Sequence, residues 1–227
     1  MMDPAMITGF AAGVAVSSSA VGLTAWVTAH RLLGRAEREA HTDALTGLLN
    51  RRGWERAAGA RTNSTGGAQD LYVILADCNG LKQVNDVYGH EAGDELIADA
   101  AAALSAAAPG ALVARLGGDE FALLATSRVF EALRARRAPV VAITEQAPGG
   151  DTVWSRIAMG AARFDGDLSE AMRRADAAMY RNKATGDGIL CVFDPYADDH
   201  ATADRPALRT RDLPARTDVP VHQVEVA

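Results

Sequence analysis

The sequence is short of cysteine, aromatic side chains and positive charge. Its two cysteines, Cys78 and Cys191, form no Cys-x-x-Cys pair or Cys/His cluster, which excludes a disulfide-stapled scaffold and gives no sign of a zinc site. Aromatic residues make up 5% of the chain, too few for a protein that stacks single-stranded bases on aromatic rings. The formal net charge of -6 argues against a non-specific nucleic-acid binder, which needs a basic surface. We therefore expect no nucleic-acid partner.

A long uncharged run, residues 6–29, occupies the N-terminal part of the chain. As a helix, such a run is about 36 Å long, which is enough to cross a hydrocarbon core of about 30 Å. Arg31, Arg35 and Arg38 follow it, and the positive-inside rule places that side in the cytoplasm. We predict a single-pass transmembrane helix within residues 1–29, in the inner (cytoplasmic) membrane, with the rest of the chain in the cytoplasm. The alternatives are a buried core helix and a cleaved signal peptide, but a signal peptide needs positive charge before the apolar run, where Asp3 is the only charged residue.

Composition divides the remaining chain into three parts. Hydrophobic residues make up 48% and charged residues 23%, close to the globular average, so wholesale disorder is excluded. Residues 30–42 are predicted to form a short helical linker. Residues 198–227 carry three prolines, mixed charges and no aromatic residue, and we predict a disordered tail over residues 196–227. Residues 43–195 form the predicted globular domain, and in the reducing cytoplasm its cysteines stay free thiols.

Within this domain the pattern alternates between helices and strands. Helices are predicted over residues 50–60, 92–107, 129–137 and 168–184, strands over residues 71–76, 111–116, 121–125, 153–162 and 189–193, and a loop over residues 59–69. The Gly117-Gly118 pair between two short apolar runs predicts a hairpin, because such a tight turn needs positive φ at both positions. The central βαββαβ order predicts an α+β fold with an antiparallel or mixed sheet and helices packed on one face.

Acidic residues gather at two points of this pattern. Asp77 follows the first predicted strand, where a carboxylate leaves the buried sheet and is available to a ligand. Asp119 and Glu120 follow the Gly-Gly turn, and adjacent acids repel each other unless a cation or solvent compensates. On an ordinary hairpin such a pair is a solvated turn. A calcium-binding EF-hand that starts at Asp77 is excluded, because its twelfth position is Tyr88 instead of glutamate.

Four sequence blocks occur in order: Asp43–Arg52 (DALTGLLNRR), Asp77–Asp94, Arg115–Phe121 (RLGGDEF) and Ala175–Lys183 (ADAAMYRNK). Together they resemble the GGDEF domain of bacterial diguanylate cyclases across the whole globular part. The resemblance implies a ferredoxin-like α+β fold, similar to the palm of nucleotidyl cyclases, with helices packed around a mixed sheet. It also implies an activity, in which two GTP molecules are condensed into cyclic di-GMP and two pyrophosphates leave.

The resemblance assigns catalytic and metal-binding roles to the acidic residues. Asp119 assists deprotonation of the 3′-hydroxyl that attacks the α-phosphate of the second GTP, and Glu120 is its neighbour in the same acid cluster. Asp119 and Glu120 are therefore the expected catalytic residues. Asp77 and Asp119 supply carboxylates, and Cys78 its backbone carbonyl, to two Mg²⁺ ions, for which Mn²⁺ could substitute. Such hard cations bridge phosphates and stabilise the leaving pyrophosphate.

The same resemblance assigns the residues that bind GTP. Asn85 and Asp94 match the guanine-reading pair, in which Asp94 accepts from the N1 and N2 donors of guanine, a pair that adenine lacks. Lys82 and Lys183 match phosphate contacts. The backbone N–H groups of residues 79–82 are expected to cradle the terminal phosphates.

Three further residues receive supporting roles. His90 is placed with the substrate-binding residues, as a base-edge or structural contact and not as a catalytic base. Asp43 is expected to cap the first helix of the domain. Arg115 is expected to anchor the hairpin.

The chain departs from the family pattern at two places that matter for nucleotides. Residues 186–188 read Gly-Asp-Gly where the family has Gly-Arg-Asn, so Asp187 reverses the charge of a phosphate-binding arginine and is expected to weaken GTP binding. Residues 108–111 read Ala-Pro-Gly-Ala where the family has an Arg-x-x-Asp motif that binds the product. We therefore predict no product-inhibition site.

The reaction needs two nucleotides, whereas one domain binds one GTP. Because the product is two-fold symmetric, we expect a symmetric homodimer with two facing half-sites. The alternative is a catalytically weak or inactive domain that binds GTP or a protein partner without turnover. Asp187 favours this alternative, while the intact Asp77, Asp119 and Glu120 favour catalysis.

Overall fold

The computed structural model describes residues 39–64, 70–144 and 152–202 and four isolated positions nearer the N-terminus. The chain separates into two compact units, Met1–Ala40 and His41–Ala227. The predicted transmembrane helix within residues 1–29 lies outside the described residues, apart from two helical positions. Among the residues that the structure describes, no helix combines the length and apolar character that crossing a membrane requires. The described positions of the predicted linker are helical up to His41.

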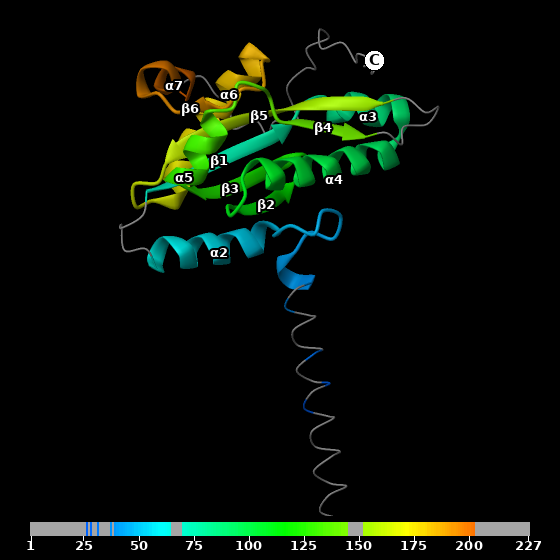
Figure 1. Cartoon of the computed structure of the whole chain (residues 1–227), viewed down its shortest axis with the longest axis horizontal. Helices are drawn as coiled ribbons and strands as arrows, with labels where there is room; N and C mark the ends of the chain where they lie inside the picture. The colour runs from blue at the N-terminus through cyan, green and yellow to red at the C-terminus, as the bar shows by residue number, and fades with distance from the viewer. Residues whose placement is uncertain are drawn as a thin grey trace, which may run out of the picture. The chain divides into compact units, whose positions relative to one another are not determined.

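The second unit is built on a six-stranded sheet, drawn as arrows in Figure 1. Its strands are β1 (Leu71–Cys78), β2 (Leu112–Gly117), β3 (Glu120–Thr126), β4 (Val141–Thr144), β5 (Val153–Arg163) and β6 (Cys191–Val192). Antiparallel neighbours run in the order β2-β3-β1-β5-β4, and β6 pairs with β5 in parallel. The sheet is therefore mixed, as predicted. Strand β4, a short strand at the edge of the sheet, is absent from the predicted elements.

Helices cover both faces of this sheet. They are α2 (Arg51–Ser64), α3 (Leu81–Tyr88), α4 (His90–Ala107), α5 (Ser127–Arg134), α6 (Leu168–Thr185) and α7 (Pro195–Thr202). Ile74 of β1 packs in one core with Leu96 of α4, and its neighbour Val73 packs in a second core with Trp54 of α2 and Ala175 of α6. The prediction of helices on one face is therefore wrong. Nearly every residue of β1 is apolar, so the strand can be buried on both sides.

Three helices differ from the sequence prediction. Helix α3 is absent from it, because the helix has only 8 residues, of which Val84 alone is buried. Helix α2 continues to Ser64, through the first part of the loop predicted over residues 59–69, and residues 65–69 lie outside the described residues. Helix α5 ends at Arg134, short of its predicted end.

The predicted hairpin is confirmed as the β2–β3 turn. Gly117 and Gly118 both have positive φ, 147° and 57°. The ladder shifts register between Arg115 and Gly117, and Gly117 then pairs with Glu120. Gly118 and Asp119 therefore form the tip of the turn, and Glu120 is the first residue of β3. This local geometry presents two neighbouring acids at the end of the sheet.

An ion pair connects the hairpin to the segment before α2. Arg115 Nη1 lies 3.2 Å from Asp43 Oδ1, and Arg115 Nε donates to the Gly118 carbonyl at 2.9 Å, so Arg115 anchors the hairpin as expected. The expected role of Asp43 as a helix cap is wrong, because its carboxylate accepts from the N–H and the hydroxyl of Thr46. Asn50 caps α2 instead, and its side-chain oxygen accepts from a first-turn N–H at 2.9 Å.

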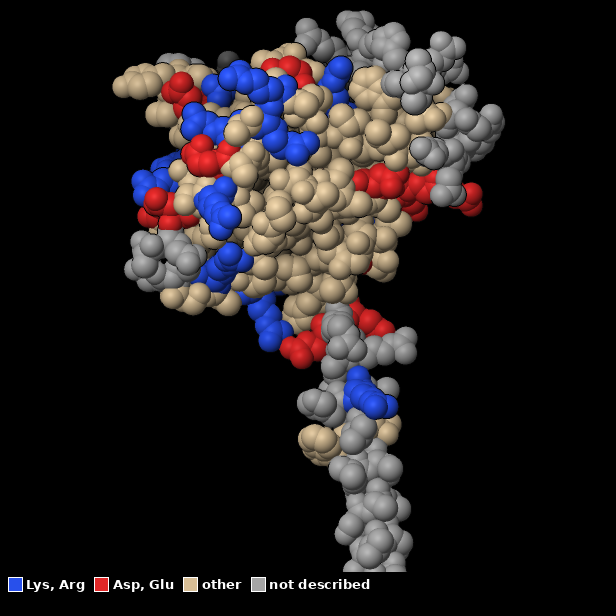
Figure 2. Space-filling model, in the orientation of Figure 1, with Lys and Arg blue, Asp and Glu red and all other residues tan. Residues whose placement is uncertain are grey.

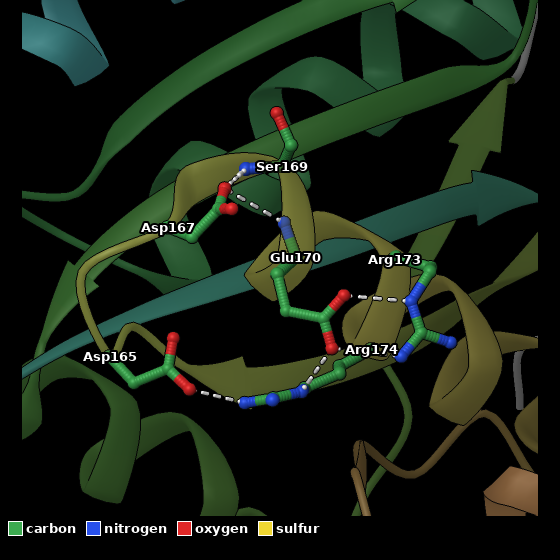
Figure 3. Close-up of polar contacts among 6 residues, drawn as sticks. All are labelled: Asp165, Asp167, Ser169, Glu170, Arg173 and Arg174. Atoms are coloured by element: carbon green, nitrogen blue, oxygen red, sulfur yellow. Dashed lines mark hydrogen bonds and ion pairs between the residues drawn. The ribbon is translucent and has the colours of Figure 1, made fainter.

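Charged side chains define the start of α6, as Figure 3 shows. Asp167 is the N-cap, and its carboxylate accepts from the backbone N–H groups two and three residues later. Glu170 bonds to Arg173 and to Arg174, each at 2.8 Å, and Arg174 also pairs with Asp165. The hydrogen bond from Arg173, with the other arginine contact, lowers the pKa of Glu170 to about 2. From this defined start, α6 runs across β1 and β5.

The predicted disordered tail, residues 196–227, is wrong in its first part. Helix α7 covers Pro195–Thr202. The Asp198 carboxylate of α7 is buried and lies 3.3 Å from Arg181 of α6. This ion pair holds α7 on the domain, because removing Arg181 would leave the buried Asp198 carboxylate without its counter-ion. Residues 203–227 lie outside the described residues.

Candidate active site

The end of β1 and the β2–β3 hairpin meet at one edge of the sheet. Asp77 pairs in register with Glu120 of β3, and the Cys78 N–H donates to the Asp119 carbonyl at 3.2 Å. The expected meeting of the strand-end acid with the two hairpin acids is thus present in the backbone. It depends on the antiparallel β1–β3 register, which no local sequence pattern specifies.

Asp77 is a buried carboxylate, with 3% of its surface exposed. The Lys183 ammonium lies 2.8 Å from its Oδ1, while Oδ2 has no hydrogen-bond partner among the described residues. Burial raises the pKa of Asp77 to about 7; the charge of Lys183 opposes this rise, and the charges of Asp119 and Glu120 add to it. An ionised Asp77 is costly in this setting, so a further cation would stabilise it.

A divalent cation fits this arrangement. Mg²⁺ prefers hard oxygen ligands and usually takes one or two carboxylates, with waters and substrate phosphates completing its shell. The Asp77 oxygen that lacks a partner in the described part of the chain is a ligand atom of this kind. Asp119 and the Cys78 carbonyl are the other predicted ligands. Within the described residues, no group of three or more His, Cys, Asp and Glu side chains could hold a metal ion.

The Cys78 side chain points inward, as expected. Its thiol donates to Ser155 Oγ at 3.4 Å, and burial raises the pKa of the thiol to about 12, so it stays protonated. The Ser155 hydroxyl in turn donates to the Asn79 carbonyl at 2.5 Å, and the Asn79 N–H donates to the Arg156 carbonyl at 3.2 Å. Two neighbouring residues of β5 therefore hold the turn that follows β1. Nothing in the sequence around Ser155 indicates this role.

Helix α3 begins directly after this turn. Its N-cap position is Gly80, and no side chain in the described chain caps its first N–H groups. Such N–H groups at the start of a helix are a suitable site for an anion. Residues 79–82, the predicted phosphate cradle, span this position. Lys82 is exposed on the first turn of the helix.

The two predicted guanine-reading residues lie on the neighbouring helices α3 and α4. Asn85 of α3 lies directly against Gly93 of α4, since a Cβ at Gly93 would stand 1.8 Å from the Asn85 side-chain oxygen. Asp94, the next residue, is exposed, and so is His90 at the start of α4. Figure 2 shows acidic side chains gathered at the end of the domain where α4 begins. A negative surface suits the N–H donors of a guanine edge.

Comparison with known proteins decides the family. The family described as "Diguanylate cyclase, GGDEF domain" matches residues 40–188. This chain belongs to the GGDEF family. It is 35% identical to diguanylate cyclase DgcM of Escherichia coli strain K12 over 161 residues, which cover 69% of the chain and 39% of DgcM. It is 34% identical to the cyclic di-GMP phosphodiesterase PdeR of the same strain over 163 residues, which cover 69% of the chain and 24% of PdeR.

Solved structures of GGDEF domains share the fold. The coiled coil and GGDEF domain of DgcB from Caulobacter crescentus, in complex with c-di-GMP, matches with a TM-score of 0.66 at 25% identity and covers 78% of this chain and 98% of that chain. The GGDEF domain of TpbB from Pseudomonas aeruginosa matches with a TM-score of 0.59 at 28% identity and covers 72% of this chain and 100% of that chain. The predicted α+β fold of the domain is confirmed.

Lys183 of this GGDEF domain lies beside an acid. It is predicted as a phosphate contact, and in the structure its ammonium pairs with Asp77. Lys82 and Lys183 are the only lysines in the chain, whereas 21 residues are arginine. Both lysines of the chain are thus among the residues that the family resemblance assigns to the phosphates.

Asp187 stands where the GGDEF family has an arginine, and its side chain accepts hydrogen bonds from residues of its own loop and of the end of α6. Its Oδ1 accepts from the Ile189 N–H at 2.9 Å, from the Asn182 amide at 3.2 Å and from the Thr185 hydroxyl at 3.3 Å. This departure from the family pattern therefore has a structural role that the sequence does not reveal. The loop holds the Asp187 carboxylate in place, and the expected loss of GTP affinity depends on the negative charge of this carboxylate.

Residues 108–111 stand where the GGDEF family has its product-binding motif. They connect α4 to β2, with Ala108 buried and the Pro109-Gly110 pair exposed. These four residues carry no charged side chain that could hold a guanine. The absence of a product-inhibition site stays a prediction.

Proposed function

We propose that this protein is a diguanylate cyclase, which condenses two GTP molecules into cyclic di-GMP and releases two pyrophosphates. The observation that carries the proposal is the buried Asp77, which adjoins the hairpin acids and keeps one oxygen without a partner in the described part of the chain. Metal-dependent phosphoryl transfer needs carboxylates arranged in this way. The similarity to DgcM, a protein named as a diguanylate cyclase, supports the proposal.

The acids would hold the metal and take the proton. Asp77 and Asp119, with the Cys78 carbonyl, would bind Mg²⁺ or Mn²⁺, and a bound cation would neutralise charge on the phosphates and on the leaving pyrophosphate. Asp119, at the tip of the hairpin, would accept the proton of the attacking 3′-hydroxyl. Glu120, the register partner of Asp77, would complete the acid cluster.

Two neighbouring groups of residues would bind the nucleotide. Asn85 and Asp94 would read the guanine, with His90 at the base edge. The N–H groups of residues 80–82 would bind the terminal phosphates, together with Lys82 on the first turn of α3. The Asn79 N–H, predicted as part of this cradle, already donates to the Arg156 carbonyl. The turn that carries these N–H groups is held from β5 through its Asn79 carbonyl and N–H, which supports a preformed cradle.

The active form would be a symmetric homodimer in which two domains present their nucleotides to each other. The symmetry of the product supports this assembly, because each domain offers one set of guanine-reading residues. We also infer a membrane anchor. The uncharged residues 6–29 and the arginines that follow support a single-pass helix in the cytoplasmic membrane, with the GGDEF domain on the cytoplasmic side.

A catalytically weak or inactive GGDEF domain that binds GTP or a protein partner is the second candidate. Asp187 favours it, because a carboxylate replaces the arginine that the family uses on phosphate. The match to PdeR also favours it, since PdeR is named for phosphodiesterase activity and not for cyclase activity.

The direct test is incubation of the full chain with GTP and Mg²⁺, followed by chromatography and mass spectrometry of the products. We expect cyclic di-GMP and pyrophosphate, lost when the metal is chelated and reduced at least about 100-fold by Asp119→Ala. Glu131→Ala, at an exposed position of α5, is the matched control and should keep the parent rate. GTP binding by the parent without cyclic di-GMP would support the second candidate.

A further inference from the structure

Lys183 supplies the positive charge beside Asp77 in this structure. The two side chains are 19% and 4% exposed, and Nζ lies 2.8 Å from Oδ1. A buried carboxylate without a cation is strongly unfavourable, so this contact stabilises the ionised acid. Within the described residues Oδ2 has no hydrogen-bond partner, so the lysine satisfies only half of the carboxylate.

The backbone that carries Lys183 is fixed against the sheet. The buried Asn182 side chain accepts from the Met159 N–H of β5 at 3.2 Å. Helix α6 lies so close to β5 that a Cβ at Gly160 would stand 2.0 Å from the Met179 nitrogen. Any change at Lys183 is therefore confined to its side chain, a flexible four-carbon stem that ends in a compact ammonium.

We propose that Lys183 is an exchangeable counter-ion: a divalent cation that binds Asp77 displaces the ammonium, which then becomes available to the phosphates of the nucleotide. This inference rests on the proposed function and deepens it. It states how metal loading and phosphate binding are coupled through one side chain of the same site.

Electrostatics supports the exchange. The ammonium already occupies Oδ1, and a divalent cation on the same carboxylate would repel it at close range in a buried setting. The divalent ion carries twice the charge and can use both oxygens, so it is the stronger counter-ion for Asp77. The displaced ammonium stays tethered beside the metal, where the phosphates of a metal-bound nucleotide would offer it new acceptors.

Chemical labelling of the full chain tests the exchange, because the chain has just two lysines. Both are acetylated with N-hydroxysuccinimidyl acetate, and mass spectrometry of peptides follows each rate. Without added metal, Lys183 should react at least about tenfold more slowly than the exposed Lys82, since its ion pair must break first. Saturating Mn²⁺ without nucleotide should raise the Lys183 rate toward that of Lys82 and leave Lys82 unchanged.

Asp77→Asn is the matched control for the labelling. In this variant Lys183 loses its charged partner, so it should react quickly, and Mn²⁺ should have no effect on its rate. Slow labelling of Lys183 in Asp77→Asn would mean that burial alone protects the lysine, and this would overturn the proposal.

A second measurement uses Mn²⁺ binding, followed by electron paramagnetic resonance in the absence of nucleotide. Lys183→Met removes the competing cation with little change in shape, and we expect Mn²⁺ to bind about tenfold more tightly than in the parent. Lys82→Met should bind Mn²⁺ as the parent does. The proposal is overturned if Lys183→Met binds Mn²⁺ with the affinity of the parent, or if neither the parent nor Lys183→Met binds Mn²⁺. It is also overturned if bound Mn²⁺ does not change the labelling rate of Lys183.

Neither measurement involves turnover, so its result is separable from that of the cyclase assay. A chain that shows the exchange but makes no cyclic di-GMP contradicts the proposed function alone. A chain that makes cyclic di-GMP without the exchange contradicts this inference alone.

Discussion

The Asn182 side-chain amide donates to Asp187 Oδ1 at 3.2 Å, and the same nitrogen also donates to the Ile189 carbonyl. Asn182 is 1% exposed, and its side-chain oxygen accepts from the Met159 N–H of β5. One buried amide therefore joins the sheet, the end of α6 and the loop that carries Asp187. Because Lys183 is the next residue, the same amide also determines where the backbone of that lysine lies.

Replacing Asp187 separates its charge from its structural role. Asp187→Asn removes the charge and keeps a side-chain oxygen that can accept the same hydrogen bonds. We expect the KM for GTP to fall about two- to fivefold at unchanged kcat, because a repulsion screened by solvent is removed. Steady-state kinetics of cyclic di-GMP formation measures the change.

Asp187→Ala is the control, because it removes the charge and the acceptor together. We expect it to lower the free energy of unfolding by about 1–2 kcal/mol, measured by urea denaturation. A KM that stays the same in Asp187→Asn would show that this carboxylate does not act on GTP.

The ionisation of Asp77 should govern how stability depends on pH. Burial raises its pKa from 3.8 to about 7 in the folded protein, so the folded state holds this proton more tightly than the unfolded state. With the metal chelated, this residue should therefore make the parent lose stability as pH rises from about 4 to 7, with the full cost present above pH 7. Asp77→Asn should remove that slope and raise the free energy of unfolding by about 1–3 kcal/mol above pH 7.

Chemical denaturation across this pH range, with the metal chelated, measures the effect. The same variant should have no cyclase activity, because it loses the carboxylate proposed to hold Mg²⁺. A variant that is less stable than the parent above pH 7 would contradict the assignment of burial as the dominant cause.

Ser155 should act on GTP binding from a distance. Its hydroxyl donates to the Asn79 carbonyl, which belongs to the turn proposed to cradle the phosphates. Ser155→Ala removes this support, and we expect the KM for GTP to rise about fivefold while kcat changes little.

Ser105→Ala is the matched control for that substitution. Its hydroxyl donates to the Ala101 carbonyl within α4, so its loss should leave the KM unchanged. Equal KM values for both serine variants would show that the turn keeps its geometry without the hydroxyl of β5.

Replacing a glycine by alanine should change the stability of the protein in opposite directions at Gly160 and at Gly59. A Cβ at Gly160 of β5 would stand 2.0 Å from the Met179 nitrogen and 2.2 Å from the Ala175 carbonyl oxygen, both in the backbone of α6. Gly160→Ala should therefore cost at least about 3 kcal/mol of stability, since neither backbone can move aside cheaply. Gly59→Ala, in α2 with nothing within 4 Å of the added Cβ, should stabilise by about 0.5–1 kcal/mol.

Urea denaturation of the two variants beside the parent measures both effects. Similar stability of Gly160→Ala and the parent would contradict the close approach of α6 to the sheet.

Short-range patterns predict the elements whose form depends on neighbouring residues. The apolar run over residues 71–76 lies within the strand β1, the Gly117-Gly118 pair makes a hairpin, and the amphipathic run after Asp167 is a helix. Short-range patterns do not predict elements that depend on partners far away in the sequence. Helix α7 is held through Asp198 by Arg181 of α6, and β4 is a short strand that pairs with β5. Successive residues of β1 lie alternately in the two cores, because α4 packs on one face of the sheet and α2 and α6 pack on the other.

The chemical groups that this protein offers can be recognised from local motifs: four motif blocks, three acids, two lysines and a glycine turn. Each motif can be read because its residues lie a few positions apart in the chain. The burial and the partners of those groups depend on the three-dimensional fold. The antiparallel register of β1 buries Asp77 beside Glu120, and α6 brings Lys183 onto its carboxylate. Burial, charge pairing and register are properties of segments far apart in the chain, and they arise when the sheet and its helices close around one another.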